Sequence, residues 1–142
     1  MAAISITAAN VFPSTGAVLH PTRCLAGETI TAGQVVYLKT SNSRWMKAQC
    51  DGTAEEAGDG TVVGIALADG VSGRFLDVQI GGKITIGGTA TVGTVYCIGA
   101  TAGAIVPWGD LVSTNYMRPI GVGSTSAVLD LCANVHPGVQ IP

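Results

Sequence analysis

No stretch of this chain has the apolar spacing of a helix. Apolar side chains never recur with a period of about 3.6 residues over about ten or more residues, as a recognisable amphipathic helix requires. Instead, short runs rich in valine, isoleucine and threonine alternate with turns, and 20 of the 142 residues are glycine. β-branched side chains fit pleated sheets, and glycines fit turns and bulges. The sequence therefore predicts an all-β protein, a compact barrel or sandwich of short antiparallel strands.

The predicted strands follow one another at short intervals, because turn residues divide the chain. An apolar run with Gly64 near its centre predicts a strand that contains a bulge or a close backbone approach. One short helix is expected near residues 112–116. The strands are expected at residues 34–39, 44–49, 61–68, 75–80 and 83–86, the last of them bracketed by Gly81-Gly82 and Gly87-Gly88.

Three short motifs occur twice in the same order, which is typical of a duplicated unit. Their positions are 31–33 with 91–93, 63–66 with 120–123, and 76–78 with 129–131. We therefore expect a single β domain at residues 27–142 that contains two pseudo-repeats, at about 27–82 and 88–135. Residues 1–26 are expected to form an extended N-terminal arm or an edge strand, because two prolines exclude a long helix.

Composition and charge exclude several classes of protein. With 47% hydrophobic and 11% charged residues, the chain is too apolar for a disordered protein and has too few charges for a coiled coil. A net charge of −2 leaves no basic surface for nucleic acid. Residues 84–109 carry no charged side chain, but glycines divide them, so we expect no transmembrane helix. No lysine or arginine precedes Arg23, so no signal peptide is expected.

No arrangement of residues predicts catalysis. The two histidines, His20 and His136, precede prolines near the ends of the chain, and no nucleophile with an orienting acid is spaced to serve them. The serine motif of α/β-hydrolases and the phosphate-binding P-loop do not occur. We therefore expect no enzyme and no cofactor, and we interpret both histidines as surface residues.

An acidic, glycine-rich loop at residues 51–60 is the one cluster that offers oxygen ligands to a hard cation. Its acids, Asp51, Glu55, Glu56 and Asp59, lack the spacing of a calcium-binding loop. We favour a mobile, solvated loop and no metal site, while the alternative of a bound cation stays open.

The four cysteines are Cys24, Cys50, Cys97 and Cys132, and no two of them form a CxxC motif. Each lies beside strand-like residues, so buried free thiols are favoured over disulfides or a metal site. Free thiols are consistent with assembly in a reducing compartment, the cytoplasm.

A fixed order of short motifs runs through residues 27–133. A turn at 41–44 precedes Asp51-Gly52-Thr53, which in turn precedes the apolar segment 63–65. A second order of motifs occurs twice. In it, a strand that runs from glycine to tyrosine is followed by an apolar strand around a glycine and then by an alternating strand. Its positions are 33–37, 63–66 and 76–78, and again 93–96, 120–123 and 129–131. This order resembles the lambda-type head decoration proteins of tailed bacteriophages and, more broadly, phage capsid cement proteins.

The resemblance implies a structural virion protein, and the chain's low charge also favours association. Such proteins bind the outside of an icosahedral head as trimers at three-fold and quasi-three-fold sites and stabilise the capsid. The implied partners are the major capsid protein and two further copies of the chain, after assembly in the host cytoplasm. A different class stays open, a receptor- or glycan-binding β module of a head fibre or tail. A weaker alternative is a carrier-type β barrel that would use Lys83.

Six residues are candidates for contacts with the capsid or with another protomer. The apolar side chains of the arm can add a strand to a sheet edge of the capsid protein, where main-chain bonds give affinity. Two tryptophans follow Tyr37 and Tyr96 at matching positions of the pseudo-repeats, which indicates core or interface packing. The candidates are Ile4, Ile6, Val11, Phe12, Trp45 and Trp108.

The cysteine interpretation has a direct test. If all four thiols are free, denaturation without a reducing agent should allow four alkylations per chain, measured by intact mass. Fewer than four additions that rise to four after reduction would show a disulfide.

Overall fold

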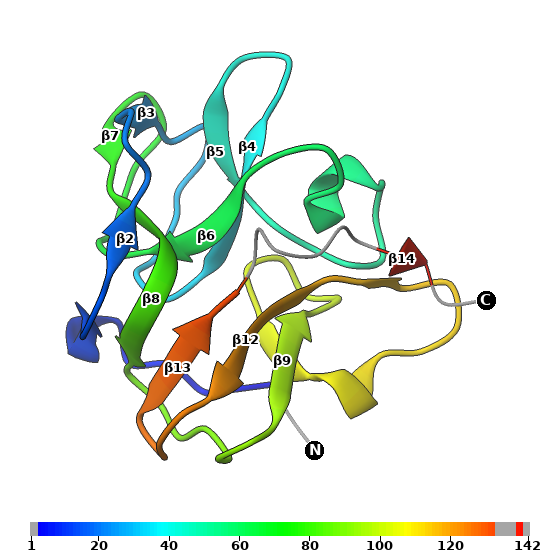
Figure 1. Cartoon of the computed structure of the whole chain (residues 1–142). Coiled ribbons are helices and arrows are strands. Elements are labelled where there is room, and N and C mark those ends of the chain that lie inside the picture. Colours follow the sequence, from blue (N-terminus) through cyan, green and yellow to red (C-terminus); the bar gives the residue numbers. More distant parts are fainter. Residues whose placement is uncertain (1–2, 133–138, 141–142) are drawn as a thin grey trace.

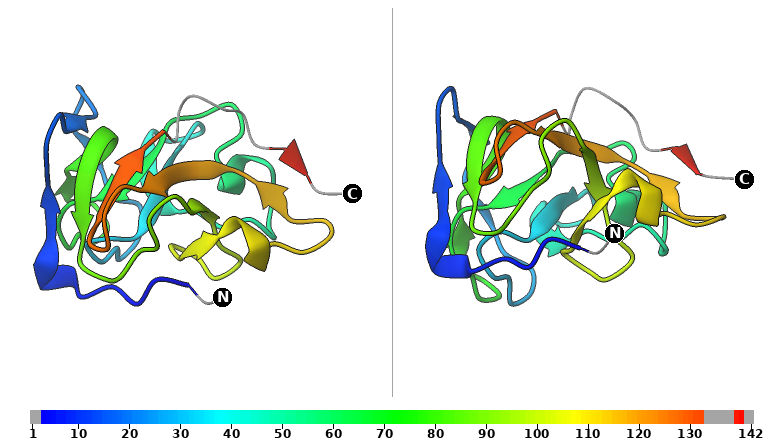
Figure 2. Two further views of the ribbon diagram at one scale, coloured as in Figure 1. Left: turned by 60° about the horizontal axis from the view of Figure 1, so that its bottom comes forward. Right: turned by 90° about the horizontal axis from the view of Figure 1, so that it is seen from below.

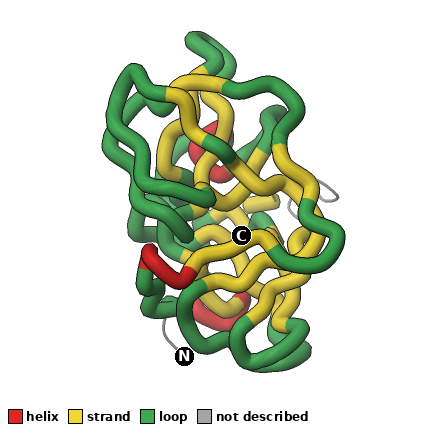
Figure 3. The backbone as a smooth tube through the Cα atoms, turned by 90° about the vertical axis from the view of Figure 1, so that its left-hand side faces the viewer, coloured by secondary structure: helices red, strands yellow, loops and turns green. Residues whose placement is uncertain are grey.

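The computed structural model describes residues 3–132 and 139–140, and these residues form an all-β fold. About 40% of the structure is strand, and no helix in the described part reaches seven residues. One large antiparallel sheet curls strongly into a half-barrel (Figure 1), and Figure 3 shows the same sheet from the side with only short helical segments. The prediction of short antiparallel strands in an all-β fold is therefore confirmed. Within the described part, no helix is long and apolar enough to cross a membrane.

Ten strands make up the large sheet. They are β1 (Val11–Pro13), β2 (Val18–Leu19), β4 (Val35–Lys39), β5 (Arg44–Lys47), β6 (Val63–Ala66), β8 (Val78–Ile86), β9 (Val95–Ile98), β10 (Ile105–Pro107), β12 (Pro119–Gly123) and β13 (Val128–Leu131). Eight of them form the path β10-β9-β12-β13-β8-β6-β4-β5, while β1 and β2 pair with β8 beside this path.

Two small sheets and three 3-10 turns complete the described structure. The small sheets join β3 (Cys24–Leu25) to β7 (Phe75–Leu76) and β11 (Tyr116–Met117) to β14 (Val139–Gln140). The 3-10 turns are η1 (Ala8–Asn10), η2 (Glu55–Ala57) and η3 (Trp108–Asp110). The short helix expected near residues 112–116 is absent, and the 3-10 turn η3 lies just before that segment.

Strand β8 runs through glycines that we expected to interrupt it. It is a single strand of nine residues, whereas the sequence predicted separate strands on either side of Gly81-Gly82. Gly82 has a φ of +75°, and a Cβ there would lie 2.0 Å from the carbonyl oxygen of Gly16. β8 also bulges against β2, because Val18 pairs with Gly81 and the next residue, Leu19, pairs with Gln79. The side-chain amide of Gln79 stabilises this stretch by donating to the carbonyls of Gly81 (2.9 Å) and Lys83 (2.8 Å). These glycines therefore admit a neighbouring segment and do not end the strand.

The two halves of the large sheet have the same order of strands, β5-β4-β6-β8 and β10-β9-β12-β13. A backbone bond from Gly33 N–H to the Ala66 carbonyl recurs as one from Gly93 N–H to the Gly123 carbonyl, both at 2.8 Å. Both donor glycines have positive φ, +91° and +80°. This recurrence agrees with two pseudo-repeats, whose boundaries stay a prediction.

The register of the strands corrects one of the matched motifs. Ala66 pairs with Val78 in the first half, and Gly123 pairs with Leu129 in the second. Val78 is thus the structural counterpart of Leu129, whereas the sequence motif aligned Leu76 with it. The motif comparison was therefore two residues out of register. A shift of two residues leaves the same side chains on the same face of a strand, so the sequence pattern does not distinguish the two alignments.

The core consists of two groups of buried side chains. The larger group fills the inside of the curl and includes Tyr37, Ile65, Ile84 and Ile98. The smaller group surrounds the fully buried Trp45. Burial of this kind is the main favourable term in folding.

The N-terminal segment packs onto the body of the domain. Residues 3–9, which we call the strap, alternate between exposed and half-buried positions, as an extended half-buried segment does. Ile4 and Ile6 pack against the larger core group, and the amide of Ile4 donates to the Ile105 carbonyl at 2.9 Å. The strap therefore contributes to the core instead of extending free of it.

The close backbone approach at Gly64 leads to a prediction about stability. A Cβ on Gly64 would lie 2.5 Å from the Gln79 carbonyl oxygen, so Gly64→Ala should lower the free energy of unfolding by about 2 kcal/mol. Gly109→Ala, where a Cβ meets nothing within 4 Å, should change it by less than about 0.5 kcal/mol. Urea unfolding of both variants measures the difference, and equal stability of the two would contradict the close approach at Gly64.

Candidate functional site

A long two-stranded ribbon forms one side of the molecule. Residues 11–25 run antiparallel beside residues 75–86, with pairing that begins at β1, continues through β2 and ends where β3 meets β7. We call these two segments the N-terminal ribbon. Figure 1 shows β2 on one side of β8 and both β6 and β13 on the other. Residues 11–25 thus pair with the free edge of β8, the strand that joins both halves of the sheet.

The N-terminal ribbon exposes large apolar side chains. Four of them keep 43–58% of their surface in water, namely Phe12, Val18, Leu19 and Phe75. Residues 11–22 carry no charged side chain, so this stretch of the ribbon is apolar and neutral. They are spread along the ribbon, with Phe12 beside Thr85 near one end and Phe75 beside Leu25 at the other. Exposed apolar groups of this size are candidates for contact with a partner.

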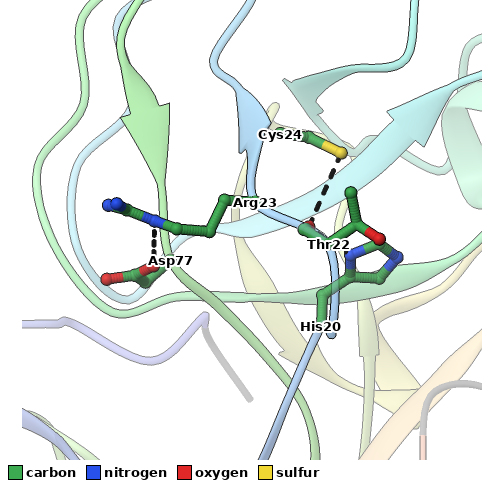
Figure 4. A network of polar contacts seen from close by, with 5 residues as sticks. All are labelled: His20, Thr22, Arg23, Cys24 and Asp77. Atoms are coloured by element: carbon green, nitrogen blue, oxygen red, sulfur yellow. Dashed lines mark hydrogen bonds and ion pairs between the residues drawn. The ribbon is translucent and has the colours of Figure 1, made fainter.

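Arg23 makes an ion pair and a ring contact near one end of the N-terminal ribbon. Its Nε lies 3.2 Å from Asp77 Oδ1, and its guanidinium carbon lies 5.2 Å from the centre of the Phe75 ring. Figure 4 shows Arg23 reaching across to Asp77 while the ring of His20 turns toward the Thr22 carbonyl. Both partners of the ion pair are exposed, so it adds less than about 1 kcal/mol to stability.

Prolines protect the edges of the large sheet. In β1, Ser14 donates to the Lys83 carbonyl, so the alternate position Pro13 faces away from β8. In β10, the carbonyl of Ile105 accepts from the strap, so the alternate position Pro107 also faces outward. Proline has no N–H, so neither outward position can donate to an added strand.

The four candidates from the arm fall into two groups. Ile4 and Ile6 are half-buried and Val11 is 5% exposed, so these three side chains serve the core of the isolated chain. Phe12, by contrast, is 56% exposed on the N-terminal ribbon. Sequence reasoning placed all four on one docking arm, and the structure presents only Phe12 to solvent.

The two tryptophans do not occupy matching positions. Trp45 lies in β5 and is fully buried, with its ring edge-on to His20 at a centroid distance of 5.3 Å. Trp108 lies in η3 and is 59% exposed. Figures 1 and 2 place η3 on the opposite side of the molecule from the N-terminal ribbon. His20 is thus half-buried against an aromatic ring instead of lying free on the surface, and His136 falls outside the described residues.

The acidic loop at residues 51–60 is fixed to the body, which corrects the expectation of a mobile loop. The carboxylate of Glu55 accepts hydrogen bonds from the amide (2.7 Å) and the hydroxyl (2.9 Å) of Thr40. Arg118 donates to the Gly58 carbonyl at 2.5 Å. In residues 3–132 and 139–140, no three histidine, cysteine or acidic side chains gather as a metal site.

Arg118 is a buried charge that the sequence did not single out. It is 4% exposed, and burial lowers the pKa of its guanidinium, an effect that the charge of Asp59 opposes. A single sequence gives no signal for this contact, because Arg118 and Gly58 are 60 positions apart. The guanidinium links the acidic loop of the first half to the second half of the sheet.

The four thiols are unpaired in the structure. Cys50 and Cys97 are buried, while Cys24 and Cys132 are half-buried. Burial raises the pKa of Cys97 to about 12, and burial likewise raises the pKa values of Cys50 and Cys132. Neutral buried thiols are poor nucleophiles and poor metal ligands, which agrees with a packing role.

Comparison with known proteins gives no relative. No protein-family model, curated protein or solved structure matches this chain. A function for the chain is therefore argued from its own residues and their geometry.

The hydrogen bonds of Glu55 in the acidic loop predict that the stability of the fold depends on pH. Hydrogen bonds from the amide and hydroxyl of Thr40 lower the pKa of Glu55, so the folded state favours the ionised carboxylate. This stabilisation is complete above the pKa that Glu55 has in the unfolded chain and is lost as the pH falls through the lower folded pKa. Glu55→Gln should therefore be less stable than the parent at neutral pH, and the difference should shrink toward about pH 3.

Urea midpoints of the parent and Glu55→Gln across this range measure the effect. Thr40→Val should remove part of the same increment, and the double variant should lose less than the sum of the two single losses. A difference between parent and Glu55→Gln that is constant with pH would show that the hydrogen bonds do not favour the ionised form.

Proposed function

We propose that this chain is a structural virion protein that binds the outside of an icosahedral bacteriophage head and stabilises the capsid. The proposal includes a homotrimer at three-fold or quasi-three-fold sites, with the major capsid protein as partner. It extends the resemblance to head decoration proteins. The motifs that carry this resemblance lie on β4, on β6 and at the junction of β7 and β8, and again on β9, β12 and β13.

The observation that supports this proposal most is the exposed apolar surface of the N-terminal ribbon. Four large apolar side chains stay in water in the isolated chain, beside a segment with no charge. Burying an apolar side chain of this size fully contributes about 1.5–3 kcal/mol, so a partner that covers the ribbon gains from each of them. A surface of this kind suits a permanent contact with a preformed, neutral surface.

Contact through side chains fits this ribbon better than the added strand that the sequence suggested. Part of the arm already pairs with β8 of its own chain, and Pro13 removes an outward donor from the edge. A capsid surface can instead accept Phe12 and Leu19 as apolar anchors. The affinity then comes from burial, and the shape of the partner surface sets the specificity.

Trimerisation would multiply weak contacts. A single ribbon buries too little surface to bind tightly once the loss of translational and rotational freedom is counted. Three ribbons on one trimer would bind as linked sites, and the second and third contacts would be intramolecular. Binding to the assembled lattice but not to free subunits would stabilise the shell by mass action.

Co-sedimentation with undecorated heads of the phage that encodes the chain tests the proposal. The parent protein should saturate the heads at a copy number divisible by three per site. Phe12→Asp and Leu19→Asp should weaken binding at least about tenfold, because each places a charge in an apolar contact. Val112→Asp is the matched control, since Val112 is 63% exposed but lies outside the N-terminal ribbon.

Two outcomes would contradict the proposal. Folded parent protein that does not bind heads would favour the other class, a receptor- or glycan-binding module of a fibre or tail. Equal loss of binding in Val112→Asp and in the two ribbon variants would show that the ribbon is not the contact surface.

A further inference from the structure

A cavity of about 470 Å³ opens beside the strap, away from the residues assigned to capsid binding. One wall consists of strap residues between 3 and 7, and the other consists of residues 87–91 with Tyr96 and Pro107. The volume lies within the range of about 300–1,000 Å³ that is usual for ligand sites.

The walls of this cavity come from the two long stretches of the chain that have no charge. Residues 1–22 and residues 84–109 contain no aspartate, glutamate, lysine or arginine, and the fold brings parts of both together here. No charged side chain lines the cavity. An ionic ligand would lose its hydration without gaining a countercharge, so the cavity favours a neutral one.

Hydroxyl groups line both walls. Five of the lining residues carry one, namely Ser5, Thr7, Thr89, Thr91 and Tyr96. A hydroxyl both donates and accepts hydrogen bonds, so it matches a ligand that presents the same group. The remaining lining residues are glycines, proline, alanine and isoleucine, which leave apolar surface between the hydroxyls.

The backbone holds the two walls at a fixed separation. The amide of Thr7 donates to the Gly87 carbonyl at 2.8 Å, and a Cβ on Gly88 would lie 2.4 Å from the carbonyl oxygen of Ser5. The hydroxyl of Tyr96 accepts a hydrogen bond from the Thr91 amide at 2.8 Å, which ties together two residues of the second wall. The cavity is therefore formed before any ligand arrives.

We propose that this cavity binds an uncharged saccharide, with the hydroxyl residues of the two walls as hydrogen-bonding groups. An extended peptide fits less well, because the neighbouring edge of β10 is occupied by the strap at Ile105 and lacks an N–H at Pro107. The proposal goes beyond capsid binding, because it gives a ligand to a cavity that the N-terminal ribbon does not line.

Titration of the isotopically labelled full chain with maltohexaose, cellohexaose and chitohexaose, followed by amide NMR, tests this site. At least one of these neutral probes should shift resonances of residues 3–7 and 87–91. Ser5→Ala and Thr89→Val should each weaken binding at least about fivefold, since each removes a hydroxyl from one wall of the cavity. The exposed Thr29, outside the cavity, supplies the matched control Thr29→Val, which should bind like the parent.

The outcomes separate this proposal from the one on the capsid. Saccharide binding weakened in Thr89→Val with head binding intact would support two independent sites. An absence of shifts with all three probes at millimolar concentration, while the spectrum shows a folded chain, would overturn the saccharide site. Shifts outside the cavity, or equal weakening by Thr29→Val, would overturn it as well.

Discussion

Strand β8 holds the structure together because it is paired along both edges. Its nine residues bond to β6 and β13 on one side and to β1 and β2 on the other. β8 bulges against β2 between Gln79 and Gly81, and the Gln79 side chain donates to the carbonyls of Gly81 and Lys83. Gly82, which has a positive φ and no Cβ, admits the carbonyl of Gly16, so the N-terminal segment can lie along this edge.

The pairing of β8 also decides which apolar side chains reach solvent. A sheet that curls into a half-barrel buries its inner face, and the strap adds Ile4 and Ile6 to that face. Residues 11–25 pair with one edge of β8, and Phe12 and Leu19 stay exposed there in the described part of the chain. One segment therefore serves both purposes, since its first part closes the core and its second part offers an apolar surface.

Local patterns in the sequence predicted local structure well. The strands predicted at 34–39 and 44–49, on either side of a turn, pair as β4 and β5. The strand around Gly64 was predicted from an apolar run, and the missing side chain of this glycine admits the carbonyl of Gln79. Contacts between distant segments were not predictable. The hydrogen bond from Arg118 to Gly58 joins a strand end to a loop, and no local pattern in the sequence indicates such a pair. The sequence did not predict that β8 is continuous, because Gly82 is typical of a turn unless its close contact with Gly16 is known.

The candidate sites follow the same division. The exposure of Phe12 and the burial of Val11 depend on which edge of β8 the arm occupies, and composition alone does not fix that edge. The neutral cavity, however, has a signal in the sequence, namely the two long stretches without charge. Either stretch alone indicates only apolar packing. When the fold places Ser5 of one stretch opposite Thr89 of the other, the absence of charge becomes a property of a cavity, and it selects neutral ligands over ions.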